Sequence, residues 1–150
     1  MRAKRSDGGL LYVWTYLENR RNFPGWHLTA DDAACARLSR TIQGLSAGSL
    51  SEPQVFPVWP VTPAVLAVPN NGRAKARSAT ELRVALAQEP RHFSLEERDR
   101  VLTIKAGSER LEELRKNLIG IIQKRGDHSM FPDGKRILHD QSLWFWWLLS

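Results

Sequence analysis

The aromatic segment QSLWFWWLLS, residues 141–150, constrains the fold more than any other feature of the sequence. In an extended strand Trp144 and Trp146 point to one face, and Phe145 and Trp147 point to the other. Neither face is polar, whereas a strand with one wet face alternates polar and apolar residues. Burial of one large aromatic side chain contributes about 2–3 kcal/mol relative to exposure. We therefore expect a strand covered on both faces, by the chain itself, by a second copy or by a ligand.

Hydrophobic spacing and turn residues divide the rest of the chain into helices and strands. The expected strands are residues 11–18, 64–68, 91–95 and 100–106, followed by two short ribbons, 128–131 and 135–139, around the turn Pro132-Asp133-Gly134. The expected helices begin at Thr29, Ser78 and Ser108 and end near residues 45, 88 and 125. A capped helix from Ser94, with Glu97 at its third position, competes with the strand at 91–95.

These elements predict a single domain of the α+β class over residues 1–150, in the approximate order β-α-β-α-β-β-α-β. We expect a mostly antiparallel β-sheet with about three amphipathic helices packed on one face. Residues 49–63 contain four prolines, and proline has no N–H to donate to a sheet. This segment is therefore expected to be an extended connection that lies against the domain.

Composition and cysteine content indicate the cellular compartment that we expect for this protein. A chain of 150 residues buries enough surface to fold without a disulfide or a metal. Cys35 is the only cysteine and cannot form an internal disulfide, which favours a reducing compartment. No apolar run approaches the roughly 20 residues of a membrane-spanning helix, and the run from Leu10 to Leu17 lacks a cleavage site for export. We expect a cytoplasmic protein with no membrane partner, no metal and no cofactor.

Basic residues are concentrated in the first half of the chain. The formal net charge is +6, and residues 1–77 carry ten Lys and Arg against five Asp and Glu. A basic surface attracts phosphate groups. The candidate nucleic-acid-binding residues are Arg20 and Arg21 in one expected loop and Arg73, Lys75 and Arg77 in another. In an extended loop the last three alternate and share one side.

Two clusters resemble catalytic patterns. Asp127, His128, His139 and Asp140 could act as an acid–base or metal group if the hairpin around Asp133 brings them together. The pentapeptide Gly44-Leu45-Ser46-Ala47-Gly48 matches G-x-S-x-G. It follows an expected helix, whereas a nucleophile elbow follows a strand, so small residues at a helix end explain it. Cys35 lies on the apolar side of the same helix, where a thiol is usually packing.

Three functions remain open from the sequence. The first is a small non-enzymatic binding or interaction protein that associates with itself or with a protein partner. Its candidate contact residues are the tryptophans Trp26, Trp59, Trp144, Trp146 and Trp147. The second is a nucleic-acid-binding protein that uses the basic residues of the first half. The third is a hydrolase-type enzyme built on the Asp/His cluster at 127–140.

Overall fold

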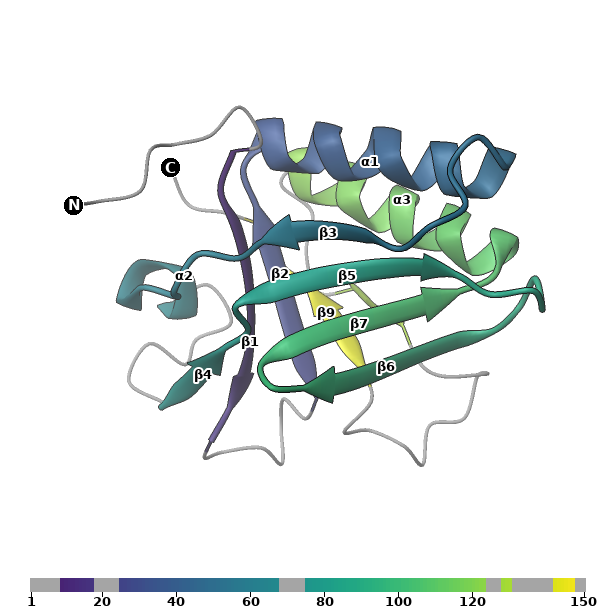
Figure 1. Cartoon of the computed structure of the whole chain (residues 1–150). Helices are drawn as coiled ribbons and strands as arrows, with labels where there is room; N and C mark the ends of the chain where they lie inside the picture. Colours follow the sequence, from purple (N-terminus) through teal and green to yellow (C-terminus); the bar gives the residue numbers. More distant parts are fainter. Residues whose placement is uncertain (1–8, 18–24, 68–74, 124–127, 131–141, 148–150) are drawn as a thin grey trace.

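A computed structural model describes residues 9–17, 25–67, 75–123, 128–130 and 142–147. They form two sheets and three helices of the α+β class (Figure 1). The first sheet has the order β4 (Ala76–Ser78), β1 (Leu11–Tyr16), β2 (Trp26–Ala30), β9 (Leu143–Phe145), β8 (His128–Met130). The second has the order β3 (Gln54–Pro57), β5 (Glu81–Leu86), β7 (Val101–Ala106), β6 (Phe93–Arg98). The helices are α1 (Asp32–Ala47), α2 (Pro63–Ala67) and α3 (Ser108–Ile122).

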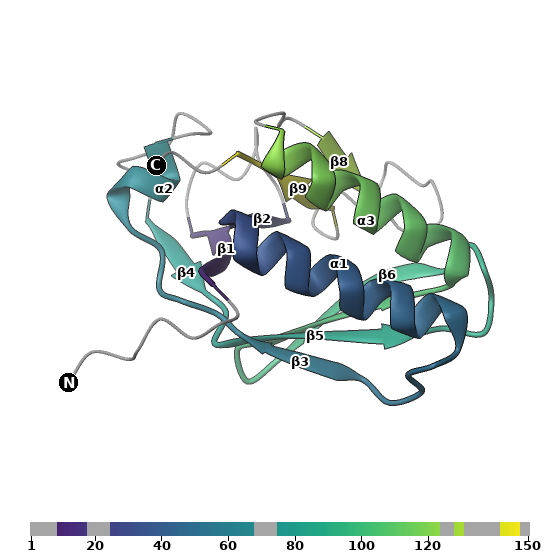
Figure 2. The ribbon, with the colours of Figure 1, turned by 90° about the horizontal axis from the view of Figure 1, so that it is seen from above.

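The main core lies between the two sheets and the helix pair. Figures 1 and 2 show α1 and α3 side by side, behind the second sheet in the view of Figure 1, with the strands of the first sheet running across those of the second. In β5, Leu82 and Val84 are buried in this core while Arg83 between them is exposed. The second sheet, in which β5 runs parallel to β7 while β3–β5 and β6–β7 are antiparallel, therefore buries one face and leaves the other toward solvent.

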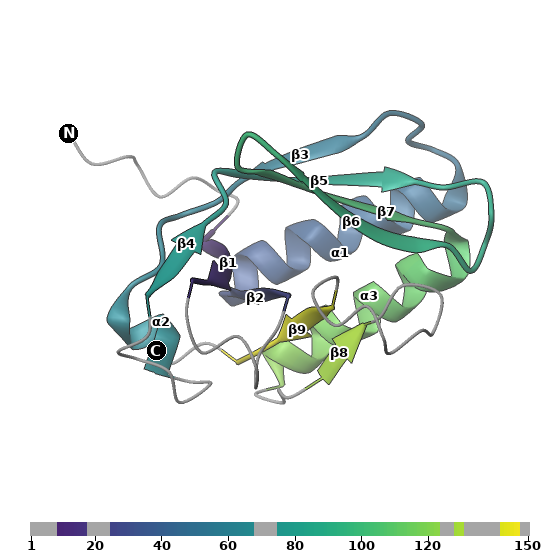
Figure 3. The same cartoon turned by 90° about the horizontal axis from the view of Figure 1, so that it is seen from below.

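The expected aromatic strand is present and both of its faces are packed, although Trp144 and Trp147 are only half-buried. Figure 3 shows β9 between β2 and β8 and beside α3. Leu143 and Phe145 are fully buried in the main core. Trp146 packs on the opposite face, in a second cluster. The members of this second cluster are Tyr12, Trp14, Tyr16, Val65, Leu66 and Trp146, with Trp59, Trp144 and Trp147 packed against them. The Pro-rich segment and α2 thus cover the second face of β9.

Strand β9 is shorter than expected, but its pairing extends past its last residue. It runs parallel to β2, with Trp26 opposite Leu143 and Leu28 opposite Phe145. The N–H of Trp146 then donates to the carbonyl of Leu28 at 3.0 Å. β8 pairs with the other edge of β9 in the antiparallel sense. The second ribbon expected at 135–139 lies outside the described residues.

The helix expected from Ser78 to Gln88 is wrong. Residues 76–78 and 81–86 are strands β4 and β5, and the Ser78 hydroxyl accepts a hydrogen bond from the N–H of Val61 instead of capping a helix. The reason is the burial pattern, because Leu82 and Val84 repeat with period two and reach the same core. A local capping pattern does not outweigh two buried side chains at strand spacing.

The strand expected at 64–68 is also wrong, since Pro63–Ala67 form the short helix α2. Pro63 occupies its first position, where the missing N–H is not needed, and the hydroxyl of Thr62 accepts from the N–H of Val65 at 3.3 Å. Helix α1 begins later than expected. Asp31 is its N-cap and accepts from the N–H of Ala34 at 2.9 Å, while Thr29 remains in β2.

Strand β2 was not expected from the sequence, but several other elements agree with it. The strands at 91–95 and 100–106 form the antiparallel pair β6–β7, which rules out the competing helix from Ser94. Residues 49–63 are largely extended and contribute β3 at an edge of the second sheet, where Pro57 is tolerated. Helix α3 starts at Ser108, and its buried residues include Leu111, Leu114 and Leu118.

Removal of the Phe145 side chain tests the role of β9. Because Phe145 is fully buried in the main core, Phe145→Ala should lower the free energy of unfolding by about 3–5 kcal/mol. Val55→Ala is the control, since Val55 is 43% exposed and its truncation should change stability by about 0.5 kcal/mol or less. Urea denaturation followed by circular dichroism measures both. A loss below about 1 kcal/mol for Phe145→Ala would contradict a core role.

Candidate functional site

A cleft of about 420 Å³ opens where β4 of the first sheet meets the second sheet. Sites for small ligands span about 300–1,000 Å³, so the cleft is large enough for one such ligand. Its lining comes from the end of β1, the Pro-rich segment, β4 and the β6–β7 turn. The lining residues are Leu17, Val58, Pro60, Ala76, Arg77, Ser78, Ala79, Thr80 and Arg100. Two of the nine lining residues are arginines, and none of the nine is acidic.

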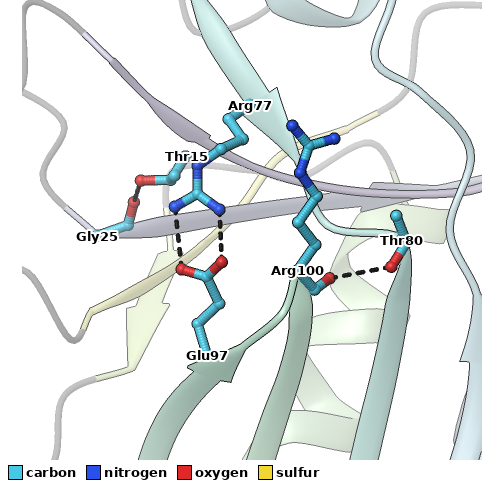
Figure 4. A network of polar contacts seen from close by, with 6 residues as sticks. All are labelled: Thr15, Gly25, Arg77, Thr80, Glu97 and Arg100. Atoms are coloured by element: carbon cyan, nitrogen blue, oxygen red, sulfur yellow. Dashed lines mark hydrogen bonds and ion pairs between the residues drawn. The ribbon is translucent and has the colours of Figure 1, made fainter.

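The turn between β6 and β7 fixes the backbone of one of these arginines. Asp99 and Arg100 have φ values of 52° and 66°, which is the left-handed conformation required in a two-residue hairpin loop. The carbonyl of Arg100 accepts from the N–H of Thr80 at 2.8 Å and from its hydroxyl at 3.3 Å (Figure 4). Thus the Arg100 backbone is tied to the segment that links β4 and β5.

The second arginine connects the two sheets. Both terminal nitrogens of Arg77, in β4, donate to the carboxylate of Glu97, in β6, at 2.5 and 2.9 Å (Figure 4). The Arg77 guanidinium also lies over the Trp26 ring, 5.5 Å from its centroid. The hydrogen bond from Arg77 is the main cause that lowers the pKa of Glu97. The same contact raises the pKa of Arg77. We call this pair the inter-sheet ion pair.

Arg100 differs from Arg77 in the contacts of its guanidinium. The side chain carries no dashed contact in Figure 4, and none of the described residues forms an ion pair or a hydrogen bond with its guanidinium. Its backbone N–H, and also the positive charge of its guanidinium, help to lower the pKa of Glu97. An exposed guanidinium at the rim of a cleft, with its backbone held in place, is available to an anion. Arginine presents a planar fork that matches phosphate and carboxylate oxygens.

The structure places two of the five predicted nucleic-acid-binding residues at this end of the molecule. Arg77 lines the cleft, and Lys75 directly precedes β4 and accepts from the N–H of Leu17 through its carbonyl at 2.8 Å. Arg20, Arg21 and Arg73 lie outside the described residues. Sequence reasoning missed Arg100, because the β6–β7 loop contains no glycine to mark a left-handed turn. The only signal was the charged run Glu96 to Arg100 between two strands.

The five tryptophans proposed as contact residues divide between the two faces of the first sheet. Trp26 is buried in the main core under Arg77, whereas Trp59, Trp144, Trp146 and Trp147 gather at the second cluster. Trp144 and Trp146 stack with ring centroids 6.1 Å apart. The described residues of the chain cover most of this aromatic surface themselves. Self-association therefore stays a prediction, without separate support from the aromatic segment.

A buried histidine organises the second cluster. His27 is fully buried, and its Nδ1 accepts from the indole N–H of Trp146 at 3.0 Å. The imidazole stacks on Trp14 with centroids 5.5 Å apart and meets the edge of Tyr16 at 4.8 Å. Burial is the main cause that raises the pKa of Tyr16. The histidine thus joins the aromatic segment to β1 across β2, which is a structural role.

Most of the Asp/His candidates for catalysis lie outside the described residues, so their assembly stays a prediction. Asp127, His139 and Asp140 lie outside the described residues, and only the backbone of His128 is described, in β8. Within the described part of the chain, no three His, Cys, Asp or Glu side chains gather as metal ligands. The pentapeptide Gly44 to Gly48 ends helix α1, with Gly48 at φ 84° as its C-cap. That context is the reverse of a nucleophile elbow.

Comparison of the chain with protein-family models, with curated proteins and with solved structures gives no match in any of the three. In the part of the chain that the structure describes, no helix is both long enough and apolar enough to cross a membrane. A function can therefore be inferred only from the cleft and its charges.

The inter-sheet ion pair makes stability depend on pH. Glu97→Gln should lower the free energy of unfolding by about 1 kcal/mol at neutral pH. Because the folded pKa of Glu97 is lowered, this contribution is complete above the unfolded value of about 4.3 and disappears as the pH falls through the folded pKa. Urea denaturation between neutral and acidic pH measures it. The control is Glu112→Gln, which breaks an ion pair within α3. An equal loss in both variants would contradict an inter-sheet role.

The position of Cys35 predicts an inert thiol. Its side chain is fully buried in α1, and burial, together with Asp32 and Asp31, raises the pKa of the thiol to about 12. The thiolate is the reactive form, so almost none is present near neutral pH. A thiol reagent such as iodoacetamide should label Cys35 only after denaturation. Labelling of the native protein at the rate of a free cysteine would contradict this packing.

Proposed function

We propose that this protein is a binding protein for nucleic acid, and that the cleft between the sheets is its contact site. The observation that carries the proposal is the guanidinium of Arg100, which lies exposed at the cleft with no ion-pair partner among the described residues. Arg77 lines the same cleft, and Lys75 adjoins it along the chain. Residues 1–77 carry ten Lys and Arg against five Asp and Glu, and such an excess of positive charge attracts phosphate.

The two cleft arginines have different tasks in this proposal. Glu97 neutralises much of the Arg77 charge, so Arg77 mainly holds the sheets at their present separation and keeps the cleft open. Arg100 supplies the charge that meets a phosphate. Because an arginine fork donates two parallel hydrogen bonds to phosphate oxygens, one such residue can fix the ligand's position as well as attract it. Lys75, which directly precedes β4, adds positive charge near the cleft.

Arg100→Gln tests the proposal, because it removes the charge and keeps a shorter, polar side chain. Fluorescence anisotropy with a labelled oligonucleotide of random sequence should show binding at low salt that weakens as salt is added. The variant should bind less tightly and reduce the slope of log affinity against log salt by about 1, the change expected for one lost phosphate contact. It should leave the circular dichroism spectrum unchanged, since the Arg100 side chain is exposed.

Arg83→Gln is the matched control. Arg83 is an exposed arginine of β5, and it is not among the residues that line the cleft. Its replacement changes the net charge by the same amount as the test variant. If the two variants weaken binding equally, the cleft is not the contact site. If the unaltered protein binds no oligonucleotide at low salt, the protein does not bind nucleic acid.

A further inference from the structure

One wall of the cleft is apolar, and the described residues leave it uncovered. Leu17, Val58, Pro60 and Ala76 contribute to it. Leu17 is 57% exposed, the highest value among the exposed large apolar residues of the described chain. Its backbone is held, because its N–H donates to the carbonyl of Lys75 at 2.8 Å. An apolar side chain kept at the mouth of a charged cleft is not needed to attract phosphate. It offers a contact surface for the apolar part of a ligand.

The polar side of the cleft is partly used within the protein. The hydroxyl of Ser78 accepts from the N–H of Val61 at 3.0 Å, and the hydroxyl of Thr80 donates to the carbonyl of Arg100 at 3.3 Å. Arg77 is engaged by Glu97. Among the described residues none forms an ion pair or hydrogen bond with the Arg100 guanidinium, and Arg100 lines the same cleft as the apolar wall.

We infer that the cleft holds one nucleotide, with its phosphate at Arg100 and its base against the apolar wall at Leu17. The inference rests on the proposed function and names the form of the ligand. A base can reach such a wall when it is unstacked, as in a single strand or a free nucleotide, whereas a duplex keeps its base faces stacked inside. The cleft volume of about 420 Å³ suits one such unit. The protein therefore selects single strands over duplexes.

The first experiment compares ligands that differ only in their bases. Fluorescence anisotropy is measured with a labelled single strand, an abasic strand of the same length and phosphate number, and a duplex. We expect the single strand to bind about fivefold or more tightly than the abasic strand, since each base contact adds to affinity. Equal binding of the two strands, or tighter binding of the duplex, overturns the inference while nucleic-acid binding stands. Absence of binding to all three overturns the proposed function instead.

The second experiment changes the apolar wall. Leu17→Ser should weaken binding of the single strand about fivefold and change binding of the abasic strand by less than about twofold. Leu17→Trp should strengthen binding of the single strand, because an aromatic ring provides a stacking surface for the base. Val55→Ser is the control, since Val55 is exposed on β3 and does not line the cleft. Equal effects of Leu17→Ser and Val55→Ser on the single strand overturn the inference.

Competition distinguishes the two sources of a nucleotide. A nucleoside monophosphate is added to the complex with the labelled strand, and inorganic phosphate is added in parallel at the same concentration. Displacement by the monophosphate but not by phosphate assigns the cleft to the free nucleotide. Displacement by neither assigns it to a unit within a strand. Equal displacement by both shows that the base adds nothing, and it overturns the inference.

Discussion

The first sheet depends on the insertion of β9 between β2 and β8. Both edges of β9 are hydrogen-bonded, Phe145 is buried in the main core and Trp146 in the second cluster. A strand with apolar side chains packed on both faces resists a shift in register, because a slip by one residue would move an indole to the site of a phenyl ring. The bond from Trp146 to His27 adds a directional constraint to this packing. Together they specify where the first sheet stands relative to the helices.

The cleft follows from this arrangement. Strand β1 pairs with β2 on one side and β4 on the other, so the position of β4 is set by the sheet that β9 completes. Arg77 of β4 then forms its ion pair with Glu97 of the second sheet. The hydrogen bond between the backbones of Thr80 and Arg100 joins the β4–β5 link to the β6–β7 turn at the same end of the molecule. The two sheets meet through polar contacts here, whereas apolar packing joins them elsewhere. A polar junction between apolar layers leaves room for a ligand that carries both charge and an apolar group.

The sequence predicts the fold class and most strands, because strongly periodic segments such as Leu111 to Leu118 and the row at 143–147 have few ways to hide their apolar faces. The sequence-based prediction is wrong where a short local pattern competes with burial of apolar side chains. Ser78 and Glu81 are spaced as a helix start, yet Leu82 and Val84 reach the core as a strand. Of the cleft, Arg77 was predictable from charge clustering. Arg100 was not, because its role depends on a turn that brings it opposite Thr80, a contact between residues 20 positions apart.

The link between Trp146 and His27 joins residues 119 positions apart in the chain. Such distant partners raise the contact order, and chains of this kind fold in about milliseconds to seconds, whereas helical bundles fold in microseconds to milliseconds. Until the final segment docks, β2 has an unsatisfied edge and its apolar side chains are open to other molecules. Refolding at high protein concentration is therefore a competition between closure of the first sheet and aggregation.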